Sequence, residues 1–299
     1  ACAASILVAE IFRLTVNQAI DKCRLGHRNS SFLPRFSEIF NSSISAFSYI
    51  ASTFEKGLLL TVGLRKGFFL VTLILGVLFS YTFARSEPTP IYPLVKHWRL
   101  IRLGFLESSH PTNPRKGFVT SSIRSAVTYF KLGWCNLLGQ ALGLFGAVTW
   151  VKYFWDGWLT THHVSKLATL DECADCQNAT VIEAFLIETG LTYMFMVLFH
   201  FIDQTIQPQD GAGNPLRSEF MCNVLKNLVG LIAMHFFIDV TGSFANPYLA
   251  YAVQRHCLVD VTKAAIFSFV YVIGPFVGTL AYLMRPPKYW RRPKLNRSV

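Results

Sequence analysis

Charged residues are scarce in this chain of 299 residues. Asp, Glu, Lys and Arg make up 15% of it and hydrophobic residues 52%, whereas an average soluble domain is about 25% charged. A folded chain with so little charge cannot cover its surface with ionised side chains, so we infer that much of this surface faces lipid. Six helices of about 20 residues each would cross a bilayer and still leave ample loop.

The cysteines lack the pattern of a disulfide framework, since there are seven of them at irregular spacing. Cys173 and Cys176 share a polar segment with His162 and His163, and these residue types suit zinc. A disulfide, or two free thiols in a loop outside the cytoplasm, is the preferred interpretation. We therefore expect no metal and no cofactor.

The net charge of +11 does not indicate a nucleic-acid partner. Lys and Arg form no continuous stripe and match no binding motif. They gather at the N-terminus, in residues 85–135 and at the C-terminus, whereas residues 159–180 contain one Lys and three acids. Because positive residues flank the cytoplasmic ends of membrane spans, this distribution predicts cytoplasmic N- and C-termini.

Apolar stretches predict an all-α membrane protein with six transmembrane helices. Residues 1–35 form a cytoplasmic segment with an amphipathic helix on the leaflet, 36–284 a membrane domain, and 285–299 a basic cytoplasmic tail. The predicted spans are residues 36–62, 67–84, 136–158, 181–202, 223–241 and 264–284.

A short apolar helix is predicted to begin at Asn246-Pro247, between the fifth and sixth spans. Asn is a good N-cap, and Pro at the first helical position loses no needed hydrogen bond. Residues 247–256 are too few to span a bilayer. Non-helical backbone inside a membrane is tolerated only where protein or a water-filled cavity satisfies it. We therefore predict a re-entrant half-helix at a pore, in preference to an exposed loop with an interfacial helix.

Several segments resemble the aquaporin (major intrinsic protein) superfamily. Ile-Asp-Val-Thr-Gly-Ser-Phe-Ala-Asn-Pro at residues 238–247 resembles the approach to the second Asn-Pro-Ala box. Residues 270–280 are similar to the sixth aquaporin helix, residues 137–142 to the start of the third, and Glu188 to the buried glutamate of the fourth. The match covers residues 136–284 and is poorer before them.

The resemblance implies six transmembrane helices plus two re-entrant half-helices in an inverted repeat, with repeat 1 at about 36–158 and repeat 2 at about 181–284. The first repeat has no Asn-Pro-Ala box. Thr89-Pro90-Ile91 is the candidate, and Tyr92-Pro93 is the competing register.

Two carboxylates are expected to be buried in corresponding positions. Glu38 lies 51 residues before Thr89, and Glu188 lies 58 residues before Asn246. These similar separations, together with the inverted repeat, predict that each carboxylate hydrogen-bonds the non-helical backbone before a half-helix, in preference to a proton relay or a misplaced span boundary.

The first box is degenerate, and the second, Asn246-Pro247-Tyr248, has a bulky third residue. The chain is therefore most similar to the unorthodox superaquaporins, the aquaporin 11/12-type group. That resemblance implies a homotetramer in the endoplasmic reticulum or another intracellular membrane rather than in the plasma membrane.

The resemblance also implies a passive channel for water or small neutral solutes such as glycerol and hydrogen peroxide, with no catalysis. Asn246 would donate to a passing solute, the carbonyls of residues 242–245 would accept from it, and the helix dipoles would oppose cations. At the selectivity constriction Leu249 replaces the usual Arg, Met234 or His235 stands for the His, and Phe69 is the aromatic candidate.

Two other functions compete with that of a passive channel. A closed-pore membrane scaffold on the same fold would have its path filled by Tyr248 and Tyr92. A membrane enzyme would need a cluster of His or acidic residues at one face, and His162-His163 is the only candidate.

Overall fold

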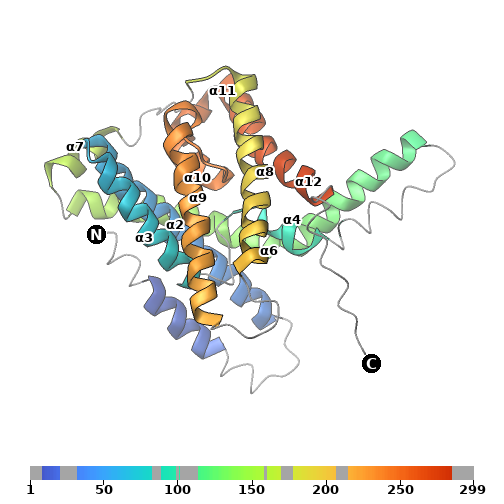
Figure 1. Cartoon of the computed structure of the whole chain (residues 1–299), viewed down its shortest axis with the longest axis horizontal. Coiled ribbons are helices and arrows are strands. Elements are labelled where there is room, and N and C mark those ends of the chain that lie inside the picture. Colours follow the sequence, from blue (N-terminus) through green and yellow to red (C-terminus); the bar gives the residue numbers. More distant parts are fainter. Residues whose placement is uncertain are drawn as a thin grey trace. The chain divides into compact units, whose positions relative to one another are not determined.

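The computed structural model describes residues 9–20, 32–82, 89–98, 101, 114–157, 160–169, 178–206 and 215–284. These residues form helices and turns and contain no strand (Figure 1). Four helical segments are long and apolar enough to cross a membrane: Ile123–Gly157, Val181–Ile206, Ser218–Thr241 and Val261–Met284. The prediction of an all-helical membrane protein is confirmed at this level. The basic tail, 285–299, lies outside the described residues.

The chain divides into two compact units. The first consists of Ala1–Ala174 together with Asn246–Cys257, and the second of Asp175–Ala245 together with Leu258–Val299. The short helix α10 (Pro247–Gln254) thus packs as part of the first unit, although the chain on both sides of it belongs to the second.

Helices α2 (Phe32–Thr61) and α6 (Pro114–Gly157) form the core of the first unit. They approach closely because α6 presents Gly139 and Gly143, where an added Cβ would overlap carbonyl oxygens of α2. This unit also contains α3 (Arg65–Thr82), α4 (Tyr92–Lys96) and α7 (Thr161–Thr169). Helix α6 begins well before the predicted start at residue 136.

The buried face of α2 is unusually polar for a membrane helix. Ser42, Ser45, Ser48 and Ser52 recur every three or four residues and are at most 2% exposed. This periodicity places them on one face of the helix. The serines lower the hydropathy of α2, which is not among the four helices that qualify as spans by composition alone.

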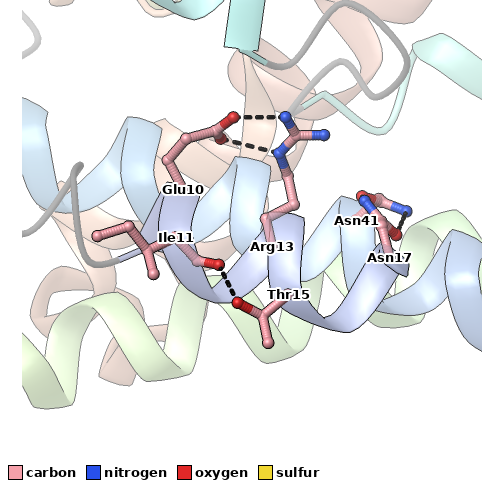
Figure 2. A network of polar contacts seen from close by, with 6 residues as sticks. All are labelled: Glu10, Ile11, Arg13, Thr15, Asn17 and Asn41. Carbon is pink, nitrogen blue, oxygen red and sulfur yellow. Dashed lines mark hydrogen bonds and ion pairs between the residues drawn. The ribbon is translucent and has the colours of Figure 1, made fainter. Parts of the chain in front are cut away.

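A helix at residues 9–20 contacts α2 through a pair of amide side chains, Asn17 and Asn41. Each donates to the other, at 3.0 and 3.2 Å, as Figure 2 shows. Glu10 and Arg13 form an ion pair one turn away. Ile11 and Phe12 are more than half exposed, so this helix has the apolar face that an amphipathic surface helix requires.

The second unit contains α8 (Val181–Ile206), α9 (Pro215–Thr241) and a final helix in three parts. These parts are α11 (Val261–Phe267), a π-helical turn η2 (Ser268–Ile273) and α12 (Gly274–Met284). The π turn directly precedes Gly274-Pro275, and such a turn accommodates a proline that lacks an N–H donor.

Candidate functional site

The backbone between α9 and α10 is non-helical and strained. Gly242, Ser243 and Ala245 have φ angles of 79°, 49° and 44°. Glycine adopts this left-handed region freely, but serine and alanine adopt it at a cost. Such strain persists only where the surrounding structure enforces it, so residues 242–245 are expected to be fixed by neighbouring groups.

The side chain of Glu188, on α8, fixes this break. It is fully buried, with 0% exposure. Its carboxylate accepts hydrogen bonds from the hydroxyl of Thr241 (2.7 Å) and from the backbone N–H groups of Phe244 (3.3 Å) and Ala245 (2.9 Å). A carboxylate inside a membrane protein is costly without partners, and here three donors surround it.

The direction of these hydrogen bonds also determines the direction of the carbonyl groups in residues 242–245. In a planar trans peptide, each N–H lies opposite to the C=O of the preceding residue. Because the N–H groups of Phe244 and Ala245 point toward Glu188, the carbonyls of Ser243 and Phe244 point away from it. Those two oxygens are therefore oriented as acceptors on the other side of the break.

Tyr271 supports the start of the same break. Its hydroxyl donates to the carbonyl of Thr241 at 2.9 Å, and its ring packs edge-on against Phe244, with 5.6 Å between the ring centroids. Tyr271 lies in the π-helical turn η2, and π turns often occur at functional sites.

Asn246 caps α10. Its backbone is extended, with φ −140° and ψ 108°, and its Oδ1 accepts from the N–H of Tyr248 at 3.0 Å. Pro247 occupies the first helical position, and Asn246 is 7% exposed. The structure thus places Asn246 at a buried helix start rather than in an exposed loop.

The first candidate box adopts a different register from the preferred one. Thr89 and Pro90 lie in a turn, and α4 begins at Tyr92, with Pro93 as its second residue. The Thr89 hydroxyl accepts from the N–H of Ile91 at 3.4 Å and therefore closes a local turn instead of capping a helix. The Tyr92-Pro93 register gives the observed helix start.

The turn before α4 and the start of α10 are both hydrogen-bonded to the same turn of α6. Gln140 donates from Nε2 to the carbonyl of Thr89 at 3.0 Å, and the hydroxyl of Tyr248 donates to the carbonyl of Leu137 at 3.1 Å. Leu137 and Gln140 are three residues apart and so are neighbours on the helix surface. One turn of α6 therefore connects the two segments that the sequence analysis identified as boxes.

Glu38 does not lie where it was expected, at the non-helical turn of residues 89–91, which is called the first break, with residues 242–245 as the second. Its side chain is 31% exposed and forms an ion pair with Lys96, with 3.4 Å between Nζ and Oε1. The similar separations of Glu38 and Glu188 from the two boxes did not place both residues alike, because distance along the sequence does not determine which face of a helix a residue occupies. Glu188 has the burial and the backbone contacts that were expected of both residues.

The candidate constriction residues are divided between the two units. Leu249, on α10, is 5% exposed, and Phe69, on α3, packs its ring against that of Phe68. Met234 and His235 lie on α9 in the second unit, where His235 is exposed beside Phe236. A constriction formed by all four remains a prediction.

A further polar cluster was missed because its members are far apart in the sequence. The indole N–H of Trp155 donates to Glu55 at 2.7 Å, and Nε2 of His163 lies 3.8 Å from the same carboxylate. The nitrogen Nδ1 of His163 lies 2.8 Å from the Thr160 hydroxyl. Cys173 and Cys176 lie outside the described residues, and in the described part no three His, Cys, Asp or Glu side chains are grouped as metal ligands.

These features define a helical membrane protein with a buried, carboxylate-fixed helix break. No family model, no curated protein and no solved structure matches the chain.

Proposed function

We propose that this protein is a passive transmembrane channel for water or small neutral solutes, of the unorthodox aquaporin type. The observation that supports it most is that the turn before α4 and the start of α10 are both attached to one turn of α6, through Gln140 and Tyr248. A channel of this type needs two broken helices whose starts meet near the membrane centre.

The geometry of the second break supports a permeation path. Helix α10 has eight residues, or about 12 Å at 1.5 Å per residue, which is less than half the thickness of a bilayer core. Its N-terminus provides a partial positive charge at Asn246, which disfavours cations and protons. The outward-pointing carbonyls of Ser243 and Phe244 supply acceptors for a passing solute.

The chemistry of the proposed path favours neutral solutes. Leu249 is apolar and buried where orthodox members have a fixed charge. The carboxylate of Glu188 is occupied by backbone and hydroxyl donors. Glycerol and hydrogen peroxide are therefore proposed beside water. A homotetramer in an intracellular membrane, with cytoplasmic termini, is proposed from the same family likeness and from the distribution of Lys and Arg.

Asn246→Asp tests the role of the proposed box. Aspartate caps a helix as well as asparagine does, so α10 is retained while the donating NH₂ group is lost and a charge is added. We expect the solute permeability of reconstituted vesicles, measured by stopped-flow light scattering, to fall at least about tenfold, which corresponds to about 1.4 kcal/mol for a lost solute hydrogen bond. Asn223→Asp, the same substitution on α9, is the control and should retain the wild-type permeability.

Two results would overturn the proposal at different points. An unchanged permeability of Asn246→Asp would remove Asn246 from the path. A wild-type protein that is folded but transports water, glycerol and peroxide no faster than lipid alone would exclude the channel. The second result would favour the closed-pore scaffold, which the half-buried Tyr248 side chain, hydrogen-bonded to α6, would help to form.

A further inference from the structure

The first unit contains a close helix crossing with a defined register. A Cβ on Gly139 of α6 would overlap the carbonyl of Ile39 and lie 2.8 Å from the Cβ of Ser42. One turn later, a Cβ on Gly143 would overlap the carbonyl of Ser43. The glycines Gly139 and Gly143 of α6 thus face Ile39, Ser42 and Ser43 of α2.

The second unit contains a crossing with the same register. A Cβ on Gly274 of α12 would lie 3.5 Å from the carbonyl of Phe185 and 3.6 Å from the Cβ of Glu188. A Cβ on Gly278 would overlap the carbonyl of Thr189. The glycines are again four residues apart, and the contacted residues of α8 have the same spacing as those of α2.

Aligning the two crossings makes Ser42 the counterpart of Glu188. Glu38 lies one helical turn earlier on α2, which explains why it does not reach the break. Ser42 is 1% exposed, as buried as the carboxylate that it replaces. The first break therefore has a serine where the second has a carboxylate.

A chain of neutral side chains extends from Ser42 to the first break. Asn136 donates from Nδ2 to the Ser42 hydroxyl at 2.8 Å. Gln140 donates from Nε2 to Oδ1 of Asn136 at 2.5 Å and to the carbonyl of Thr89 at 3.0 Å. Asn136 and Gln140 are 2% and 0% exposed, so this Ser42–Asn136–Gln140 relay is buried throughout.

The backbone of the first break explains why side-chain donors contact it, whereas the second break is contacted by an acceptor, Glu188. The second break offers N–H groups to Glu188, whereas Pro90 has no N–H. The first break instead presents carbonyls to the protein. Gln140 donates to the carbonyl of Thr89, and the hydroxyl of Tyr129 donates to that of Pro90 at 2.6 Å. A carboxylate facing these oxygens would be repelled.

We propose that the Ser42–Asn136–Gln140 relay positions the first half-helix by donating hydrogen bonds, as Glu188 positions the second by accepting them. Gln140 is the residue that contacts the break, and Asn136 and Ser42 act by orienting its amide. This inference refines the proposed channel and rests on it for its effect on permeation. Its structural part, the anchoring of residues 89–97, has a readout that needs no transport.

Hydrogen–deuterium exchange of the protein in lipid nanodiscs tests the anchoring. The amides of Leu94, Val95 and His97 are hydrogen-bonded within the segment that Gln140 anchors. In Gln140→Leu we expect peptides covering 89–97 to exchange about tenfold faster. Peptides covering 247–254 should be unaffected, which also reports that the variant has folded. Gln18→Leu, at an exposed position of the 9–20 helix, should leave both segments unchanged.

Gln140→Glu tests whether residue 140 acts by donating a hydrogen bond to the Thr89 carbonyl or only by filling space. The introduced carboxyl can donate to the Thr89 carbonyl only while it is protonated; once ionised, it is a buried charge that faces the oxygens of the break. We expect solute permeability near that of wild type at about pH 5 and a loss of at least about fivefold by about pH 8. The titratable and charged groups on the elements around this break are present in all the proteins compared: Tyr129, Tyr248, Lys96, His97 and Glu38. Wild type and Gln18→Glu should show no such change.

The outcomes separate this inference from the proposed function. Unchanged exchange at 89–97 in Gln140→Leu, or a Gln140→Glu permeability independent of pH, would overturn the positioning role. If the wild-type protein transports nothing, the channel fails, and the exchange experiment alone then decides whether Gln140 anchors the segment.

Discussion

At the scale of single residues, Glu188 shows how an acid is retained inside a membrane protein. Its carboxylate accepts from one hydroxyl and two backbone N–H groups, which compensates for much of the cost of desolvation. In return it fixes backbone at Ser243 and Ala245 that would otherwise leave the left-handed region. Its contacts are those of a residue that holds strained backbone in place.

Glu188→Gln should lower the stability of the protein. An amide has one acceptor oxygen and adds two donors, so at least one N–H of the break loses its partner and meets another donor. We expect a loss of about 1–3 kcal/mol, measured as a lower apparent melting temperature in detergent. Glu38→Gln is the control, because an exposed ion pair contributes about 0–1 kcal/mol. Equal losses for the two variants would contradict the assignment of the break to Glu188 alone.

At the scale of helices, glycine determines which pairs pack closely. Gly139 and Gly143 bring α6 against α2 in the first unit, and Gly278 brings α12 against α8 in the second. Contacts at this distance are available only to residues without a Cβ. Other glycines, such as Gly230 on α9, face open space and have no such role.

Gly143→Ala and Gly230→Ala should therefore have opposite effects. At Gly143 the added methyl overlaps the Ser43 carbonyl and must separate α2 from α6, which costs about 1–3 kcal/mol for an overpacked site. At Gly230 nothing lies within 4 Å of the added Cβ. There, the lower backbone entropy of the unfolded chain should stabilise the helix by about 0.5–1 kcal/mol. Melting temperatures of the two variants, measured side by side, check this; a stabilised Gly143→Ala would refute the close crossing.

At the scale of the whole molecule, apolar surface places the chain in a membrane. Four helical segments meet the length and hydropathy of a span, and helices such as α6 keep large side chains exposed, among them Phe130, Leu138 and Phe145. Large apolar side chains exposed on helices of this length are typical of a lipid-facing surface. The proposed six-span topology adds α2 and α3 as spans, and in that topology the distribution of Lys and Arg predicts that both termini are cytoplasmic.

Cysteine labelling in sealed vesicles checks that orientation. Leu64, between α2 and α3, and Val261, at the start of α11, are exposed and should lie on the non-cytoplasmic side. Glu219, near the start of α9, should lie on the cytoplasmic side. We expect an impermeant maleimide to label Leu64→Cys and Val261→Cys from one side only and Glu219→Cys from the other, above the labelling of the unmodified chain. Labelling of all three from the same side would contradict the six-span topology.

The sequence alone determined the local features of this protein. Apolar stretches long enough to span a bilayer predicted the helices, and Asn246-Pro247 predicted a capped helix start, because capping and hydropathy depend on residues close together in the chain. The burial of Glu188 also agrees with expectation. The early start of α6 was missed, and the Tyr92-Pro93 register was given only as the alternative to Thr89-Pro90, since helix ends are set by packing as well as by composition.

Only the tertiary structure decided which residues meet. Ser42, rather than Glu38, corresponds to Glu188, and Gln140 of α6 bonds to Thr89. These pairings depend on the rotation of each helix about its axis and on the contact of segments about 50 to 100 residues apart. Spacing along a chain specifies neither the rotation of a helix nor the contact it makes. A shift by one helical turn gives a residue a new partner but leaves the periodic pattern of the sequence unchanged.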